Sequence, residues 1–415
     1  MKEVLERIAD GHQFYHARMP EYASTDPLPF RISPEPFYIS DEQAKAIGRI
    51  GQEVCGLMQA TAELYETNDD VHELLDRGKP AVFQNVQPPQ YLFFRPDMII
   101  TSDGFAICEI ETSVFGLAVA ELLNQGYSEA GFETLARPGI LGDHIEHATP
   151  SNGTIVYTDK TKAFVGQLEF LAEKVFSGRN RQWRASHIGE ASGSESQYRA
   201  HYLVEYLTDA AVQSLYDSAE PPKTMPSLSP QFEEKAILAF IWDKRFEDFY
   251  SKALGAAGLE LLRTAIPPTW IVGEEQYFAP GLPAGMNQSV DLAGLARSKR
   301  GFVLKPSGFS SDSSWSEGVT FLQSMSHETA AETLGRVTAD ATDRLYVVQE
   351  FKEGVKNPMS YDGSDDPSSM QARVRLTPYF SNVVGELLGI KATGCEGTHL
   401  IHASTASVNT AVSIK

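Results

Sequence analysis

Four of the charged side chains in the stretch FFRPDMIITSDGFAICEIE could bind a metal ion and a phosphate group. Arg95 and Asp97 are two positions apart, so on a β-strand their side chains would share one face. Glu109 and Glu111 have the same spacing on the strand expected next. If the turn at residues 102–104 closes a hairpin, three carboxylates and one arginine converge on a single site.

Burying these carboxylates together is costly unless a cation lies among them. Mg²⁺ prefers oxygen ligands and takes one or two carboxylates plus substrate phosphates, so Asp97, Glu109 and Glu111 are the predicted metal ligands. The planar fork of Arg95 suits phosphate oxygens. The alternative is a solvated hairpin face with surface salt bridges. The apolar runs YLFF and FAICEI on the two strands argue against that alternative.

A second candidate is Lys305, which lies in the apolar run FVLKP before a serine- and glycine-rich loop at residues 307–318. Backbone N–H groups of such a loop, beginning at Ser307 and Gly308, can cradle phosphates that a strand-borne lysine can also reach. The sequence GxxxxGK[ST] and the Rossmann fingerprint are both absent. The alternative is an ordinary strand end before a surface turn.

Two further segments could contact a nucleotide. The apolar run LYVVQEF ends in Gln349 and Glu350, which could hydrogen-bond an adenine ring; the alternative is simply the end of a core strand. Lys235 opens a predicted helix in FEEKAILAFIW, where a cation is electrostatically unfavourable. A ligand phosphate would relieve this, although the neighbouring Glu233 and Glu234 would relieve it as well.

The elements that position these residues follow from hydrophobic periodicity. Residues 41–66 have helical spacing and an acidic start, and residues 91–111 have the pattern of paired strands. FGLAVAELLNQGY predicts a helix closed by Gly126. EEKAILAFIWDKRFEDFYSKAL predicts one continuous helix. The C-terminal third is expected to alternate strands and helices, ending with THLIHAS.

The predicted fold class is α/β (α+β), with mixed sheets in two or three lobes that share one cleft. We expect an N-terminal helical region at residues 1–90. An α/β region with the metal and substrate hairpin follows at residues 91–230. Residues 231–415 are expected to form the nucleotide-binding lobes.

The composition limits the partners that the protein can have. Its 415 residues are 42% hydrophobic and 22% charged, which is ordinary for a globular protein. A net charge of -20 disfavours nucleic acid and anionic membrane surfaces, and no apolar run has membrane-spanning length. The cysteines Cys55, Cys108 and Cys395 are too isolated for a zinc site or a disulfide framework. We therefore expect a cytoplasmic protein without nucleic-acid or membrane partners.

Taken in order, these segments resemble the ATP-grasp ligases, in particular the circularly permuted branch typified by the synthetase domain of glutathionylspermidine synthase. FRPDMII…CEIETSVFG resembles that family's Arg-x-Asp and Glu-x-Asn strands, and EEKAILAFIWD resembles its NKAILPLLW helix. FVLKPSG…EGV resembles its phosphate loop, and YVVQEF its adenine hinge. Metal residues precede nucleotide residues, as in the permuted arrangement. The resemblance extends over about residues 90–410.

The resemblance implies an ATP-grasp-like fold and a role for each candidate. Arg95 would stabilise the transferring phosphoryl group, and Mg²⁺ would be bound by Asp97, Glu109 and Glu111. The ATP phosphates would be held by Lys235, Lys305, Ser307 and Gly308, and adenine by Gln349 and Glu350. The sequence departs from the family at Glu111, where the family has asparagine, and in its longer, serine-rich loop. The C-terminal end matches less clearly, so Ser404, Ser407 and Asn409 receive no role.

By this resemblance the chain is an ATP-dependent ligase that joins a small-molecule carboxylate to an amine through an acyl phosphate, with ATP and Mg²⁺ as cofactors. Two alternatives stand beside it. The first is a nucleotide-binding protein without ligase activity, motivated by Glu111 and the unusual loop. The second is a phosphotransferase on the same scaffold, which would release a stable phosphorylated product.

Overall fold

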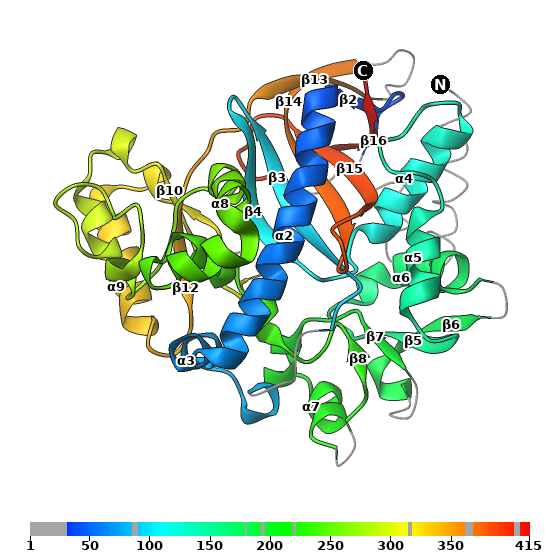
Figure 1. The fold of residues 1–415 in the computed structure, drawn as a ribbon, viewed down its shortest axis with the longest axis horizontal. Coiled ribbons are helices and arrows are strands. Elements are labelled where there is room, and N and C mark those ends of the chain that lie inside the picture. Colours follow the sequence, from blue (N-terminus) through cyan, green and yellow to red (C-terminus); the bar gives the residue numbers. More distant parts are fainter. Residues whose placement is uncertain are drawn as a thin grey trace.

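Three β-sheets with surrounding helices make up the protein in the computed structural model (Figure 1). The structure describes residues 31–84, 90–178, 181–191, 196–218, 221–313, 318–361, 368–401 and 407–415. The α/β (α+β) class predicted from the sequence is confirmed, since strands and helices mix throughout these ranges.

The largest sheet contains both strands of the predicted hairpin. Its central strands run in the order β1-β16-β15-β14-β3-β4, with β13 paired to β14 and β2 paired to β16. The bounds are β1 Arg31–Ile32, β2 Phe37–Ile39, β3 Phe93–Thr101, β4 Gly104–Glu111, β13 Lys356–Tyr361, β14 Ser368–Ser381, β15 Leu387–Cys395 and β16 Val408–Ile414. Each of the three regions predicted as domains contributes strands to this sheet, so the sheet unites the two ends of the described chain.

Two smaller sheets flank the large one. The antiparallel second sheet has the order β11-β10-β12-β9 (Thr320–Phe321, Phe302–Pro306, Tyr346–Glu350, Thr269–Ile271). The parallel third sheet has the order β6-β5-β7-β8 (Gln182–His187, Asn152–Tyr157, Gln197–Arg199, Thr224–Met225). Figure 1 shows the second sheet on the left and the third at the lower right.

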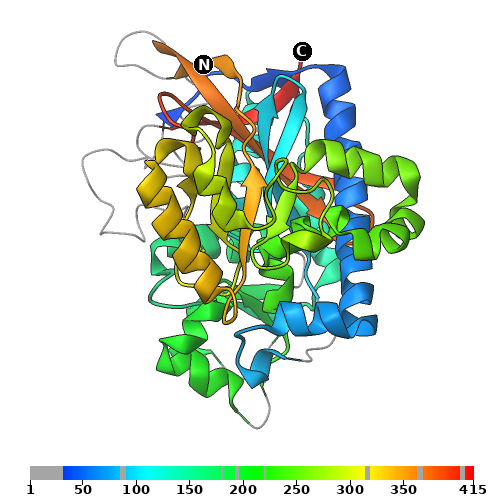
Figure 2. The same cartoon turned by 90° about the vertical axis from the view of Figure 1, so that its left-hand side faces the viewer.

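The helices cover the sheets on both sides. Their bounds are α2 Asp41–Thr67, α3 Asp69–Asp76, α4 Leu117–Glu129, α5 Ile140–Ala148, α6 Val165–Phe170, α7 Ala210–Tyr216, α8 Glu247–Ala265 and α9 His327–Asp340. The long helix α2 crosses the large sheet in front and contacts α8, whereas α4 contacts β15 and β16 (Figure 1). Turned by 90°, α2 runs along one side of the molecule and the lobe with α9 faces the viewer (Figure 2).

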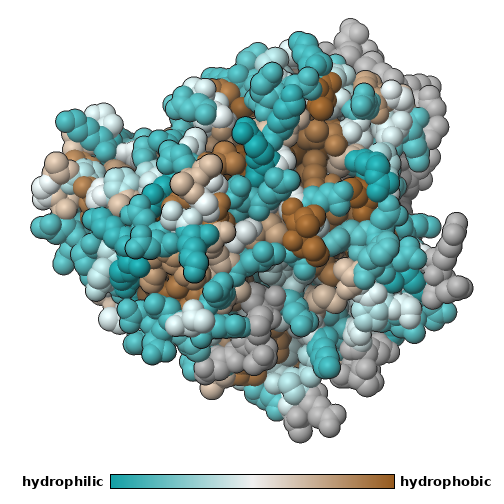
Figure 3. All heavy atoms as spheres, viewed as in Figure 1, coloured by the Kyte–Doolittle hydropathy of each residue, from teal (hydrophilic) through white to brown (hydrophobic). Residues whose placement is uncertain are grey.

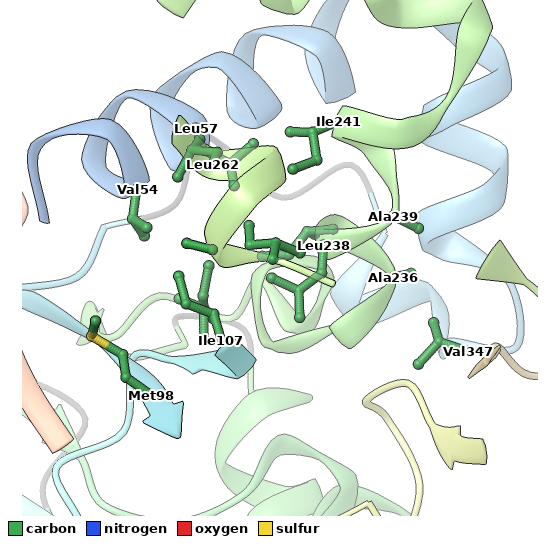
Figure 4. Packing of buried hydrophobic residues seen from close by; sticks show 14 of the residues in the cluster. Val54, Leu57, Met98, Ile107, Ala236, Leu238, Ala239, Ile241, Leu262 and Val347 are labelled. Carbon is green, nitrogen blue, oxygen red and sulfur yellow. The ribbon is translucent and has the colours of Figure 1, made fainter. Parts of the chain in front are cut away.

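One hydrophobic core joins the large sheet to the second sheet. It brings together Val54 of α2, Leu262 of α8, Ile107 of β4 and Val347 of β12 (Figure 4). The segment at residues 235–246 lies between these elements and is buried on nearly every side. This packing holds the hairpin and the second sheet in a fixed relation, which the site requires.

That buried segment overturns one prediction. The expected continuous helix is instead three 3₁₀ turns, Lys235–Leu238, Phe240–Trp242 and Lys244–Phe246, and α8 begins only at Glu247. An amphipathic α-helix buries one face, but here every residue from Lys235 to Ile241 is buried. Asp243 also stops the run, because its carboxylate accepts a hydrogen bond from the backbone N–H of Arg245.

Two other predicted boundaries also differ. Helix α4 does not end at Gly126 but continues to Glu129. Gly131 supplies the stop, with φ of 91°, and the N–H of Phe132 bonds to the carbonyl of Tyr127 as in a Schellman motif. At the predicted strand THLIHAS, residues 398–401 are not a strand, and residues 402–406, including Ser404, lie outside the described ranges.

The face shown in Figure 3 is mostly hydrophilic, with apolar residues gathered near its centre. Among the described residues, no helix combines the length and the apolar character that a membrane crossing requires.

The contact between α2 and β14 depends on Gly51. A Cβ there would stand 2.3 Å from Cε1 of the fully buried Phe380, whose ring stacks on Phe94 and has no room to move. We expect Gly51→Ala to lower the free energy of unfolding by about 1–3 kcal/mol through overpacking. Gly48→Ala on the same helix meets nothing within 4 Å and should raise it by about 0.5–1 kcal/mol. Urea unfolding measures both; equal stability of the two variants would contradict this packing.

Candidate active site

A β-bulge at Cys108 places the predicted carboxylates on one face of the hairpin. In the pairing of β3 with β4, Asp97 lies opposite Glu109 but Met98 lies opposite Ile107, which leaves Cys108 as the extra residue. Without the bulge, Glu109 would share the core-facing side of Ile107. The predicted turn at residues 102–104 does close the hairpin, since Thr101 pairs with Gly104.

Asp97 is buried between two arginines. Its Oδ1 lies 3.1 Å from Arg95 Nε, and its Oδ2 lies 2.8 Å from Nη1 of Arg375 on β14. Asp97 is only 1% exposed, so both of its oxygens are committed to these guanidinium groups. Sequence reasoning missed Arg375. The alternating pattern of QARVRLT is the signal that could have identified an arginine on the face opposite the core.

Arg95 is the centre of this charge cluster. Its Nη2 lies 2.7 Å from Glu111 Oε2, and its Nη1 donates to the carbonyl of Phe115 over 3.0 Å. Burial alone would lower the pKa of Arg95, but Asp97 and Glu111 together raise it well above its ordinary value. Arg95 therefore stays positively charged and rigidly oriented beneath the pocket.

Glu109 and Glu111 face the pocket with partly exposed side chains, at 23% and 32%. Burial opposes ionisation of Glu109, but Lys235, whose Nζ is 3.3 Å from Glu109 Oε2, and Arg95 lower its pKa to about 2. Burial raises the pKa of Glu111, and the negative charges of Glu109 and Asp97 add to that effect. The two glutamates thus offer oxygen atoms of different basicity side by side.

Lys305 and Gln349 lie on the face of the second sheet that contacts β4. Lys305 Nζ donates to the carbonyl of Cys108 over 3.0 Å and to Gln349 Oε1 over 2.8 Å. The bulge therefore provides the carbonyl that binds the ammonium group. Burial lowers the pKa of Lys305.

The predicted adenine contacts have protein partners in this structure. Gln349 Nε2 donates to Thr269 Oγ1 over 3.1 Å, and Glu350 pairs with Lys352 at 2.8 Å. The backbone N–H of Glu350 donates to the carbonyl of Pro268. An adenine role for Gln349 and Glu350 stays a prediction.

The loop after β10 is joined to the segment that carries Lys235. Ser307 accepts two bonds of 2.8 Å, one from the N–H of Lys235 to its carbonyl and one from the N–H of Ala236 to its Oγ. Lys235 Nζ donates to the carbonyl of Ser313 over 3.1 Å. Residues 314–317 of the predicted phosphate loop lie outside the described residues.

A pocket lies where the three sheets meet. Its first wall carries the predicted site residues, namely Glu109, Glu111, Lys235, Gly308 and Ser313. Its second wall, which sequence reasoning missed, comes from the third sheet and the start of α4, with Phe115, Arg199, His201 and Tyr202. Burial, helped by Arg199, lowers the pKa of His201 to about 3, so this imidazole is neutral at physiological pH.

The described residues contain no group of three or more His, Cys, Asp and Glu arranged to hold a metal ion. Asp97 turns away from the pocket toward its arginines, whereas the oxygens of Glu109 and Glu111 line it. Mg²⁺ bound with a nucleotide needs only one or two carboxylates, because phosphates and water supply the remaining ligands. The pocket therefore fits a phosphate-borne Mg²⁺ at the two glutamates, and a metal contact by Asp97 stays a prediction.

Behind Arg375 lies a further buried cation, Lys391 of β15. Its Nζ donates to Thr393 Oγ1 over 2.9 Å and to Asn409 Oδ1 over 3.4 Å, both neutral groups. Burial, and next Arg375, lower its pKa to about 7. The polar face of the large sheet thus continues from β4 to β16, and Asn409, which had no role from the sequence, is part of it.

The lowered pKa of Lys391 gives stability a specific pH dependence. Between about pH 7 and its ordinary pKa of 10.5, the unfolded chain binds a proton that the folded chain does not. Stability should therefore rise with pH in this window, by up to about 1.4 kcal/mol per pH unit. The free energy of unfolding of Lys391→Met minus that of the native protein should therefore fall by that slope as the pH rises from 7 to 8 and to 9, as measured by urea unfolding. Lys45→Met, at an exposed lysine of α2, should show no such trend; parallel curves for both variants would refute the assignment.

The fold of the chain was compared with those of known proteins, and solved structures match it. No protein-family model and no curated protein matches the chain. A solved structure of a glutathione synthetase-like effector from Globodera pallida, in its apo form, superposes with a TM-score of 0.57 at 12% identity, covering 99% of this chain and 97% of that one. A putative γ-glutamylcysteine synthetase from Methylobacillus flagellatus KT matches with a TM-score of 0.44 at 10% identity, over 83% of each chain.

The first match extends over almost the whole length of both proteins, so it concerns the complete arrangement of the three sheets. The more specific resemblance to glutathionylspermidine synthase stays a prediction. The chain has a mixed α/β fold similar to that of the glutathione synthetase-like effector.

Proposed function

We propose that the protein is an ATP-dependent ligase that joins a carboxylate to an amine through an acyl phosphate. One observation carries the proposal, namely the convergence of cations and two glutamates at a single pocket from distant parts of the chain. Lys235 in the pocket lining and Arg95, Arg375 and Lys305 behind it outnumber the carboxylates Asp97, Glu109 and Glu111. The lining also contains the ion pair of Arg199 with Glu233, which leaves this balance unchanged. A buried excess of positive charge favours an anionic ligand, and the synthetase-like fold agrees with a polyphosphate.

The ATP phosphates would bind between Lys235 and the backbone at Ser307 and Gly308. Lys235 lines the pocket, and its ammonium group is paired only loosely with Glu109 at 3.3 Å. Lys305 lies deeper, where it neutralises the nucleotide from the side of the second sheet. A loop of small residues lets the phosphates approach the backbone closely.

Mg²⁺ would be held by Glu109 and Glu111 together with the ATP phosphates. When bound, the ion neutralises phosphate charge and polarises the phosphorus–oxygen bonds. Glu111 stands where the resembled family has asparagine, and its charge is already compensated by Arg95 at 2.7 Å. The additional negative charge of the glutamate is therefore accommodated by this ion pair.

The reaction proceeds in two displacements. A carboxylate oxygen of the substrate attacks the γ-phosphorus of ATP, the bond to the β,γ-bridging oxygen breaks, and ADP leaves. The amine nitrogen then attacks the acyl carbon, inorganic phosphate leaves, and the nitrogen gives up a proton. Arg95 and Arg375, fixed by Asp97, stabilise the negative charge on the transferring phosphoryl group. Neither displacement needs a covalent protein nucleophile.

Nucleotide binding without ligation is the second candidate function. The relative described above is named an effector, and the side chains of Lys305 and Gln349 are bonded to protein groups rather than left open. Calorimetry that detects Mg-ATP binding, with no ADP formed over a broad panel of acids and amines, would favour this function. A stable phosphorylated product instead of free phosphate would favour a phosphotransferase.

The guanidinium fork of Arg95 should be essential to turnover. Arg95→Lys keeps the charge but loses the bidentate geometry toward Asp97, Glu111 and phosphate. We expect kcat to fall by about 10²- to 10³-fold, with a smaller effect on the KM for ATP. ADP release with Mg-ATP and acid–amine pairs measures the effect. Arg137→Lys is the matched control, because Arg137 is 64% exposed and far from the pocket lining; unchanged turnover in Arg95→Lys would rule out its proposed role.

Removing one pocket-facing carboxylate should weaken the response to Mg²⁺. In Glu109→Gln we expect the Mg²⁺ concentration for half-maximal ADP release to rise by at least about tenfold. Glu111→Asn should keep activity, because the resembled family has asparagine at this position. Glu353→Gln removes a carboxylate that is 64% exposed on the surface and serves as the control. A Mg²⁺ titration that is the same for Glu109→Gln and the native protein would place the ion elsewhere.

A further inference from the structure

A buried ion pair connects the N-terminal helical region to the pocket. Lys79 Nζ lies 2.7 Å from Glu234 Oε1, and the two side chains are 1% and 2% exposed. Lys79 follows α3, whereas Glu234 directly precedes Lys235 of the pocket wall. Desolvating both charges offsets most of their attraction, so stability alone explains such a pair poorly.

The same carboxylate holds the loop that follows β10. The N–H of Phe309 donates to Glu234 Oε1 over 3.2 Å. Gly308 lies so close that a Cβ on it would stand 2.6 Å from the carboxylate carbon of Glu234. With the two bonds to Ser307 described above, the first three residues of the loop are fastened to the segment that carries Lys235.

Lys79 extends from a backbone that is itself fixed. Gly78 has φ of 69°, and a Cβ there would stand 1.8 Å from the carbonyl oxygen of Asp343, just after α9. The N–H of Lys79 donates to the carbonyl of Asp76 over 3.0 Å, and its carbonyl accepts a 2.7 Å bond from Gln84 Nε2. The backbone that carries the Lys79 side chain is therefore held in place by Asp343, Asp76 and Gln84.

Glu234 depends on that ammonium group. Its second oxygen, Oε2, is buried and has no hydrogen-bond partner among the described residues. Lys79 is the cation that compensates the carboxylate, and without it the charge would be left in an apolar surrounding. Loss of Lys79 should therefore push Glu234 toward water and away from Gly308 and Phe309.

We propose that Lys79 and Glu234 are positioning residues that hold Lys235 and the Gly308–Phe309 backbone in the geometry that binds the ATP phosphates. The inference rests on the proposed function for the identity of the ligand. It assigns the N-terminal region a part in nucleotide binding, although none of the described residues of that region lines the pocket.

The test compares Lys79→Met with Arg77→Met. Arg77, two positions earlier, also loses an ion pair on substitution, with Glu274 at 3.3 Å. Its other side-chain bond is to the carbonyl of Ala341, and it makes no hydrogen bond to a described residue of the loop. We expect Lys79→Met to weaken Mg-ATP binding in calorimetry by about tenfold or more. Hydrogen exchange at the amide of Phe309 should accelerate in the same variant. Arg77→Met should lose stability in thermal unfolding while leaving both readouts unchanged.

A double variant distinguishes a loss of positioning from misfolding of the Lys79→Met protein. Lys79→Met with Glu234→Gln removes both charges but keeps an oxygen for the N–H of Phe309, so it should restore stability and slow the exchange at Phe309 again. ATP affinity and Phe309 exchange in Lys79→Met that match Arg77→Met would overturn the proposal. So would a double variant that exchanges as fast as Lys79→Met.

Failure of the proposed function has a different signature. If the native protein does not bind Mg-ATP at all, the ligase proposal fails, and the exchange measurements alone decide the positioning role. Faster exchange at Phe309 in Lys79→Met than in Arg77→Met then supports the anchored loop. Equal exchange in the two variants rejects it.

Discussion

Asp97 accepts bonds from Arg95 and Arg375 while only 1% exposed, and the remaining charges of the site are arranged around this triplet. Burying a carboxylate is costly unless cations compensate its charge, and both oxygens of Asp97 are bonded to cations. Two arginines paired with one carboxylate have a net charge of +1, and Glu111 balances this charge through its ion pair with Arg95. The chain thus builds a rigid, nearly neutral platform whose outer surface still attracts anions.

The bulge at Cys108 links this platform to the second sheet. It turns Glu109 toward the pocket and frees the carbonyl of Cys108, which accepts a hydrogen bond from Lys305. One inserted residue therefore orients both a carboxylate on β4 and an ammonium group on β10. The bulge at Cys108 therefore positions charged groups on both sides of the contact between β4 and β10.

Sequence reasoning located the hairpin and its charged residues because strand alternation is local and requires only a short stretch of chain. It could not connect Arg375 with Asp97, since nothing near residue 97 indicates which strand will pair with β3. Strands β15 and β16 were missed for a related reason: Lys391, Thr393 and Asn409 interrupt the apolar pattern although they are buried. The helix predicted at residues 235–246 was wrong because residues 235–241 are all buried, a tertiary property that replaced the expected amphipathic face.

The pairing of Asp97 with Arg375 also constrains synthesis. The two residues are 278 positions apart, and β3 forms its second ladder only with β14. At ribosomal speeds of about 5–20 residues per second, the hairpin waits roughly 15 to 55 seconds for its partner strand. During that interval the nascent chain carries an open sheet edge and an uncompensated cluster of charge. The large sheet can therefore be completed only after β14, β15 and β16 have been synthesised.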